Sequence, residues 1–176
     1  MQLTAIQPSS PIPILTYHQV DAPPRASAPY RSLIVSPAAF ARQMAALKFL
    51  GYTGLCMSAL QPYLRGEKHG KVVGITLDDG YLNNLEHALP ALQRCGFSAT
   101  CYVVSNQLGG SNVWDHAIGI APKPLMTAAQ LREWIAGGQE VGAHTHNHVR
   151  LPELAPAVAR EEISRSKAVL DRKSVV

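Results

Sequence analysis

The sequence predicts an α/β fold with a largely parallel sheet, and two observations support this expectation. Short apolar stretches typical of strands alternate with stretches that have helical spacing and helix-capping residues. The strand stretches are almost continuously apolar, as expected for a sheet covered on both faces. A chain of 176 residues has the length of one domain that buries its own core. We therefore expect a single domain over residues 1–176.

The first elements are a strand and a helix separated by a loop. The apolar run PIPILTYH predicts a buried strand that ends at His18. The stretch DAPPRASAP, residues 21–29, is typical of an irregular surface loop. A helix is expected to follow, with Ser36 as its N-cap, Pro37 as its first residue and Gly51 just beyond its end.

The middle of the chain continues the alternation. We expect a weaker strand at 52–55 and a helix at 58–65. The run KVVGITL, residues 71–77, is the clearest strand of the sequence. Residues 85–95 have helical character, but Pro90 should kink or break that helix.

The last part of the chain repeats the same order. A strand is expected at 98–104, followed by a helix that begins after Thr127 and ends at Gly137. The next short strand is QEVGAH, residues 139–144, and a helix of mixed charge is expected at 151–172.

Groups that can bind a metal or move protons follow three of these strands. They are His18, the pair Asp78–Asp79, and His144. The C-terminal ends of parallel strands are where active sites form, so we expect these groups to meet. Neighbouring aspartates on an extended backbone point to opposite sides, so one can face a metal while the other serves as a general base. The alternative for DDG is an Asp-Gly turn with solvated carboxylates.

The stretch HTHNH places His144, His146 and His148 within five residues. On an extended backbone all three could face one way, although a turn at Asn147 would change that. Two imidazoles and one carboxylate form a ligand set for a catalytic zinc or a similar divalent ion. Histidines that are merely satisfied in the core or exposed at the surface are the alternative.

The motif TLDDG followed by HTHNH resembles the polysaccharide deacetylases, carbohydrate esterase family 4, which share the NodB homology domain. The family motif T-F-D-D-G is matched at 76–80 except for Leu77, and H-[S/T]-x-x-H is matched by His144, Thr145 and His148. PILTYH and WIAGGQEVGAH are also typical of the bacterial members. The resemblance implies the N-terminal part of a distorted (β/α) barrel with mostly parallel strands.

The resemblance also implies a reaction and roles for these residues. It implies hydrolysis of N-acetyl groups on a sugar or polysaccharide, with one divalent metal ion, zinc being the expected one. Asp78 would be the general base, and Asp79, His144 and His148 would bind the metal. Thr145 would steady the loop through a hydrogen bond.

Further motifs of the family, including the one that supplies its general acid, do not occur before Val176. We therefore expect an incomplete domain without its last strands, in which His18 or His146 are candidates to replace the acid. Trp114, in the expected loop 109–115, either lines a sugar-binding groove or caps the edge of the core.

Composition limits the partners. The net charge of +4, with no basic run interleaved with aromatics, does not indicate nucleic-acid binding. No apolar stretch approaches the ~18 residues of a membrane span, and no secretory signal is present, so a cytoplasmic protein is expected. Three cysteines without a CxxC pair, Cys56, Cys95 and Cys101, are expected to be buried thiols.

The expected partner is an N-acetylated glycan, and exopolysaccharide, peptidoglycan, chitin fragments and lipid-linked sugars all stay open. Two other hypotheses accompany the deacetylase. One is a catalytically inactive remnant that at most binds metal or glycan, and the other is a pH-sensing module built on the histidines.

Overall fold

In a computed structural model, which describes residues 11–173, five strands form a parallel sheet. Its members are β1 (Ile14–Tyr17), β4 (Thr53–Leu55), β5 (Val72–Leu77), β6 (Thr100–Val103) and β7 (Glu140–Ala143). Their order is β1-β5-β6-β7, with β4 paired to the first half of β5, and every pairing is parallel. The predicted fold class is confirmed.

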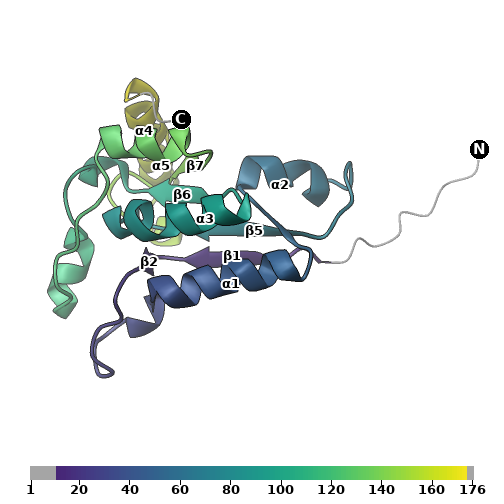
Figure 1. Cartoon of the computed structure of the whole chain (residues 1–176). Coiled ribbons are helices and arrows are strands. Elements are labelled where there is room, and N and C mark those ends of the chain that lie inside the picture. Colours follow the sequence, from purple (N-terminus) through teal and green to yellow (C-terminus); the bar gives the residue numbers. More distant parts are fainter. Residues whose placement is uncertain (1–10, 174–176) are drawn as a thin grey trace, which may run out of the picture.

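Helices connect these strands close to the predicted positions. They are α1 (Pro37–Phe49), α2 (Met57–Leu64), α3 (Leu89–Cys95), α4 (Ala128–Ala136) and α5 (Pro156–Arg172). The Ser36 hydroxyl accepts a hydrogen bond from the amide of Ala39, and Thr127 forms a reciprocal capping box with Gln130. Figure 1 shows α1 and α3 side by side along the strands, and α4 and α5 near β7.

The core lies between one face of the sheet and most of the helices. Its buried apolar side chains come from β5, α1, α3, α4 and α5: Ile75, Leu77, Phe40, Met44, Leu92, Trp134 and Leu170. On the opposite face, α2 approaches the sheet at Gly74. A Cβ atom at Gly74 would lie 2.9 Å from Cδ2 of Leu60, so any larger residue there would force the Leu60 side chain to shift. Both faces of the central strand are therefore covered, as its continuous apolar sequence predicts.

Two predicted helices begin differently from expectation. A π-helical segment, η2 (Asn84–Ala88), precedes α3, and Pro90 lies in the first turn of α3, where a missing amide proton costs little. The last helix starts at Pro156, after a short 3₁₀ turn, η5 (Leu151–Glu153).

Other segments also correct the expectations. Trp114 does not lie in an irregular loop but in a 3₁₀ helix, η4 (Val113–Ile118). A second parallel pair, β2 (Gln19–Val20) with β3 (Ile34–Val35), was not predicted because two residues are too short to show any periodicity. Further short 3₁₀ turns are η1 (Arg31–Leu33) and η3 (Ser105–Gln107).

The cysteines are only partly as expected. Cys101 is buried, whereas Cys56 and Cys95 are half-buried, and all three are free thiols. Burial beside the sheet raises the pKa of the Cys101 thiol, so it stays protonated at neutral pH.

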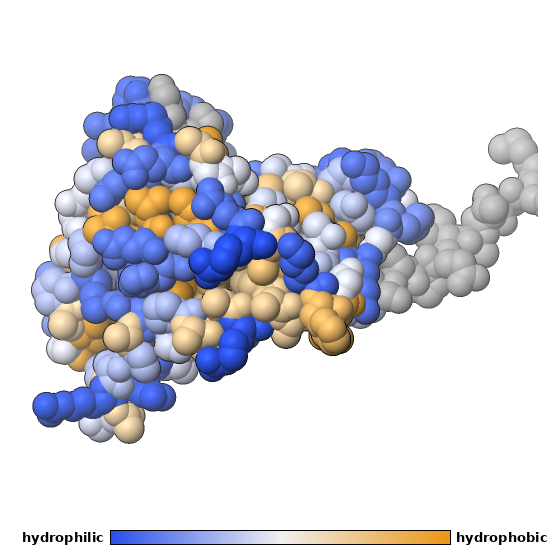
Figure 2. Space-filling model, in the orientation of Figure 1, coloured by the Kyte–Doolittle hydropathy of each residue, from blue (hydrophilic) through white to orange (hydrophobic). Residues whose placement is uncertain are grey.

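The surface is mixed in character. In Figure 2, hydrophilic residues surround hydrophobic patches on the face that α1 and α3 cover. Exposed apolar side chains include Phe49 and Leu50 at the end of α1. Within residues 11–173, no helix is long and apolar enough to cross a bilayer.

Candidate metal centre

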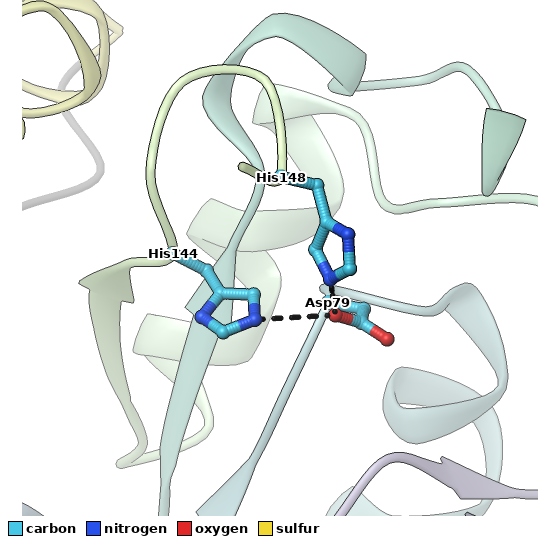
Figure 3. Close-up of side chains that lie close together, drawn as sticks. All are labelled: Asp79, His144 and His148. Carbon is cyan, nitrogen blue, oxygen red and sulfur yellow. Dashed lines mark ion pairs between the residues drawn. The ribbon is translucent and has the colours of Figure 1, made fainter. Parts of the chain in front are cut away.

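Polar groups gather where β5 and β7 end, at the same edge of the parallel sheet. Asp78 and Asp79 follow the last residue of β5, and His144 follows the last residue of β7. The single strand β6 lies between them and pairs with both. In Figure 3 the side chains of Asp79, His144 and His148 point toward one another from these two strand ends.

The three side chains form a compact donor set. Oδ1 of Asp79 lies 3.4 Å from Nε2 of His144 and 3.2 Å from Nε2 of His148. One donor atom from each residue lies within 4.8 Å of the others. Two imidazole nitrogens and one carboxylate oxygen are the protein ligands of many catalytic zinc sites.

The burial of Asp79 bears on whether a metal ion would fit between these residues. Its side chain is only 6% exposed, and Oδ1 has no hydrogen-bond partner among the described residues. A buried carboxylate oxygen without a partner is costly, and a cation held between it and two imidazoles would remove that cost. The donor set therefore fits a divalent metal.

The local backbone conformation sets the directions of these side chains. Asp79, Thr145 and His148 have φ angles of 73°, 62° and 58°, in the left-handed region that ordinary residues rarely adopt. The expectation of an extended backbone through Asp79 is therefore wrong. Of the two forms left open for the histidine stretch, the extended one does not occur. The different directions of Asp78 and Asp79 come from this turn instead of from strand alternation.

The two aspartates line different hollows. Asp79 lines a cavity of about 210 Å³ together with His18, Tyr30, Trp114 and His148. Asp78 lines a more open hollow, on the α2 side of the sheet, with Thr76, Tyr102 and His144. Of the three side chains of the candidate centre, Asp79 and His148 line the first hollow and His144 lines the second.

The carboxyl group of Asp78 is partly buried beside the centre. Burial raises the pKa of its carboxyl above the ordinary value, against the opposing charges of His144 and His18. Nε2 of His18 lies 4.0 Å from Oδ2 of Asp78, so the structure brings these two predicted residues together.

The two histidines of the centre have different surroundings. Burial lowers the pKa of His144, which favours the neutral imidazole that can bind a metal. The ring of His148 stacks on the indole of Trp114, with 4.2 Å between centroids and 20° between planes. Trp114 therefore borders the centre directly, as a wall of the cavity.

His146 lies outside the cluster. Its ring is buried and shares a 2.8 Å hydrogen bond between Nδ1 and Oγ of Ser105. Thr145 supports the loop, because its Oγ1 accepts a hydrogen bond of 3.3 Å from the amide of Val149. The prediction that Thr145 steadies the loop agrees with this contact.

Two neighbours of the centre were not predicted. Tyr30, which is 55% exposed, lines the cavity from the loop before η1, where nothing in the sequence distinguishes it from a surface residue. Glu162 contacts the histidine loop from α5, within a helix of mixed charge. Both residues come near the centre only because distant segments meet in the fold, so no signal in the sequence points to either.

Comparison with known proteins agrees with this geometry. Residues 65–175, more than half of the chain, match the polysaccharide deacetylase family. The chain belongs to the polysaccharide deacetylase family. A relative from Bacillus subtilis, YxkH, named as a polysaccharide deacetylase, is 29% identical over 162 residues. The match covers 91% of this chain but 51% of that relative, so the chain spans about half of its length.

Solved deacetylase structures have the same fold. The Streptococcus pyogenes deacetylase PplD, solved in complex with acetate, has a TM-score of 0.72 and 28% identity, with 92% of this chain and 68% of that one covered. IcaB from Ammonifex degensii has a TM-score of 0.76 and 25% identity, with coverages of 94% and 70%. The NodB-type deacetylase fold predicted from the motifs is thereby confirmed.

Proposed function

We propose that this member of the polysaccharide deacetylase family is a metal-dependent hydrolase that removes N-acetyl groups from a sugar or polysaccharide. The observation that carries the proposal is the buried Oδ1 of Asp79 facing Nε2 of His144 and Nε2 of His148, beside a second carboxylate. The family membership and the acetate complex of PplD support the same reaction class.

Asp79, His144 and His148 would hold one divalent cation, and zinc is the ion that this donor set favours. Such a cation supplies Lewis acidity toward a carbonyl oxygen and toward water. Asp78 would accept the proton of the attacking water, and its half-buried position beside the centre supports this role. His18, 4.0 Å from Asp78, is the group available to orient that carboxylate or to pass the proton on.

The cavity beside the centre suits a sugar ring. Trp114 and the exposed Tyr30 line it, and aromatic faces pack well against the apolar faces of sugars. Hydrogen-bonding groups from His18 and Asp115 line the same cavity. An N-acetylated glycan is therefore the proposed substrate class.

A second proposal is a chain that binds metal or glycan without turnover. It rests on the same donor set and the same cavity, which could hold a cation and a glycan without a reaction. This alternative keeps the metal centre and the cavity but loses the reaction, so one experiment with two readouts separates the proposals.

The experiment measures bound zinc and acetate release from chito-oligosaccharides. We expect about one zinc per chain, lost in Asp79→Asn and His148→Ala and kept in the exposed control His87→Ala. Asp78→Asn should keep the zinc but lose acetate release. Zinc binding that survives both ligand substitutions would refute the centre. Zinc binding by the unaltered chain without acetate release would favour the binding-only alternative.

A further inference from the structure

A carboxylate on α5 holds the loop between the two proposed metal ligands. Oε2 of Glu162 accepts hydrogen bonds from the amides of His146, at 3.0 Å, and Asn147, at 2.9 Å. Its Oε1 accepts a third, of 2.6 Å, from Nδ2 of Asn147. We propose that Glu162 is a positioning residue that sets the geometry of His144 and His148, an inference that rests on the proposed metal-dependent function.

The loop needs such support because its backbone is strained. Thr145 and His148 both have positive φ, a conformation that is unfavourable unless the surrounding structure stabilises it. The amides of His146 and Asn147 belong to no strand or helix. Glu162 satisfies both amides at once, at the middle of the loop between the two proposed ligands.

The opposite side of the loop is fixed by η3. The amide of Asn106 donates to the carbonyl oxygen of His146, at 3.0 Å, and Oγ of Ser105 bonds Nδ1 of the same residue. His146 is thus held between η3 and α5, which explains its burial and its absence from the metal cluster. Glu162 therefore holds one side of the loop from α5, while the other side is hydrogen-bonded to η3, which follows β6.

A second residue of α5 acts on the same side. Oγ of Ser166 donates a 2.9 Å hydrogen bond to the carbonyl oxygen of Thr145. Ser166 lies one turn after Glu162, so both side chains project from one face of the helix. The docking of α5 therefore determines the loop conformation at Thr145, His146 and Asn147.

Glu162 is the stronger of the two contacts. Burial raises the pKa of Glu162, but the hydrogen bonds from Asn147 and His146 outweigh burial and keep this pKa below its ordinary value. Charge-assisted bonds of this kind are stronger than the neutral bond made by Ser166. Because Glu162 is only half-buried, its loss should displace the loop without unfolding the chain.

The test compares Glu162→Ala with Glu161→Ala, an exposed neighbour on the same helix. Zinc affinity is measured by competition with a chelator, and unfolding is measured on the metal-free protein. We expect Glu162→Ala to weaken zinc binding about tenfold, as removal of a group that supports metal ligands does. Glu161→Ala should bind zinc like the unaltered chain.

Two further readouts separate positioning from general destabilisation. With cobalt in place of zinc, the visible absorption of Glu162→Ala should differ from that of the unaltered chain at saturation, while Glu161→Ala should not. Glu162→Gln keeps one oxygen that can accept amide protons, so it should recover part of the affinity.

The outcomes distinguish this inference from the proposed function. Unchanged zinc affinity and an unchanged cobalt spectrum in Glu162→Ala, with zinc binding lost in Asp79→Asn, would overturn the role of Glu162 alone. Failure of the unaltered chain to bind zinc would overturn the metal centre and this inference with it.

Discussion

At the scale of single residues, backbone strain is concentrated at the candidate centre. Among the described residues, four non-glycine residues have positive φ, and three of them, Asp79, Thr145 and His148, belong to the centre or its loop. Strained conformations persist only where the surrounding structure holds them, and they cluster at functional sites. Their location here supports the assignment of the centre independently of the residue types.

Gly80 follows this strained turn and allows a prediction about stability. Its φ is +83°, and a Cβ atom would lie 2.9 Å from Cγ1 of Val103. Gly80→Ala should therefore combine backbone strain with overpacking and lower the free energy of unfolding by about 2–4 kcal/mol. Chemical denaturation of the metal-free protein measures this loss.

Gly51 provides the matched control. It has a similar φ of +79°, but a Cβ atom there would meet nothing within 4 Å. Gly51→Ala should lower the free energy of unfolding only by the backbone strain, about 1 kcal/mol. Equal losses in the two variants would show that contact with Val103 contributes nothing.

At the scale of elements, Glu140 links β7 to β6 and to α2. Its Oε2 accepts hydrogen bonds from the Thr100 hydroxyl and from the amide of Ser58, the latter at 3.2 Å. Burial raises its pKa, but these hydrogen bonds outweigh burial and hold the pKa of Glu140 below its ordinary value of 4.5. The ionised side chain therefore stabilises the contact between the three elements.

The sign of this pKa shift predicts a pH dependence. A carboxyl with a lowered pKa in the folded state contributes stability above the unfolded pKa, and that contribution is lost as the pH falls through the folded value. Glu140→Gln should be about 1 kcal/mol less stable than the unaltered chain at neutral pH. The difference should begin to shrink as the pH falls below 4.5, and it should disappear once the pH is below the lowered pKa of the folded state, where Glu140 is neutral too.

Denaturant titrations at neutral pH and at a series of pH values below 4.5 follow the loss of the ionised state of Glu140. Glu133→Gln, on the exposed side of α4, controls for the loss of a negative charge. If the difference in the free energy of unfolding between Glu140→Gln and the unaltered chain stays constant with pH, the proposed role of the ionised carboxylate is contradicted.

At the scale of the whole molecule, the candidate centre joins segments that are far apart in the sequence. Asp79 follows β5, while His144 and His148 follow β7, and the loop between them also contacts α5. A cation bound at all three side chains would therefore stabilise the fold as a whole, since the unfolded chain lacks the assembled site.

This arrangement predicts a stability gain on metal binding. Zinc at a free concentration of 100 times its dissociation constant should raise the free energy of unfolding by about 2.7 kcal/mol. Thermal or chemical unfolding with and without zinc measures the gain. Asp79→Asn should show none of it at the same zinc concentration, and a full gain in that variant would place the bound ion elsewhere.

The sequence by itself determined the order of the elements and the residue types that meet at the candidate centre. Apolar runs predicted β1, β5, β6 and β7, and Ser36 and Thr127 predicted the starts of α1 and α4, because these signals are local. The carboxylates after β5 and the histidines after β7 had to meet, since parallel strands end at one edge of the sheet.

Only the tertiary structure decided how the loops direct these groups. The turn at Asp79 replaces the expected extended backbone, and His146 is turned toward Ser105. Trp114 stacks on His148, and Glu162 holds the loop from a helix whose sequence shows no sign of that role. The physical reason is that loop conformation depends on hydrogen bonds and stacking with distant segments, and local sequence periodicity contains no information about such partners.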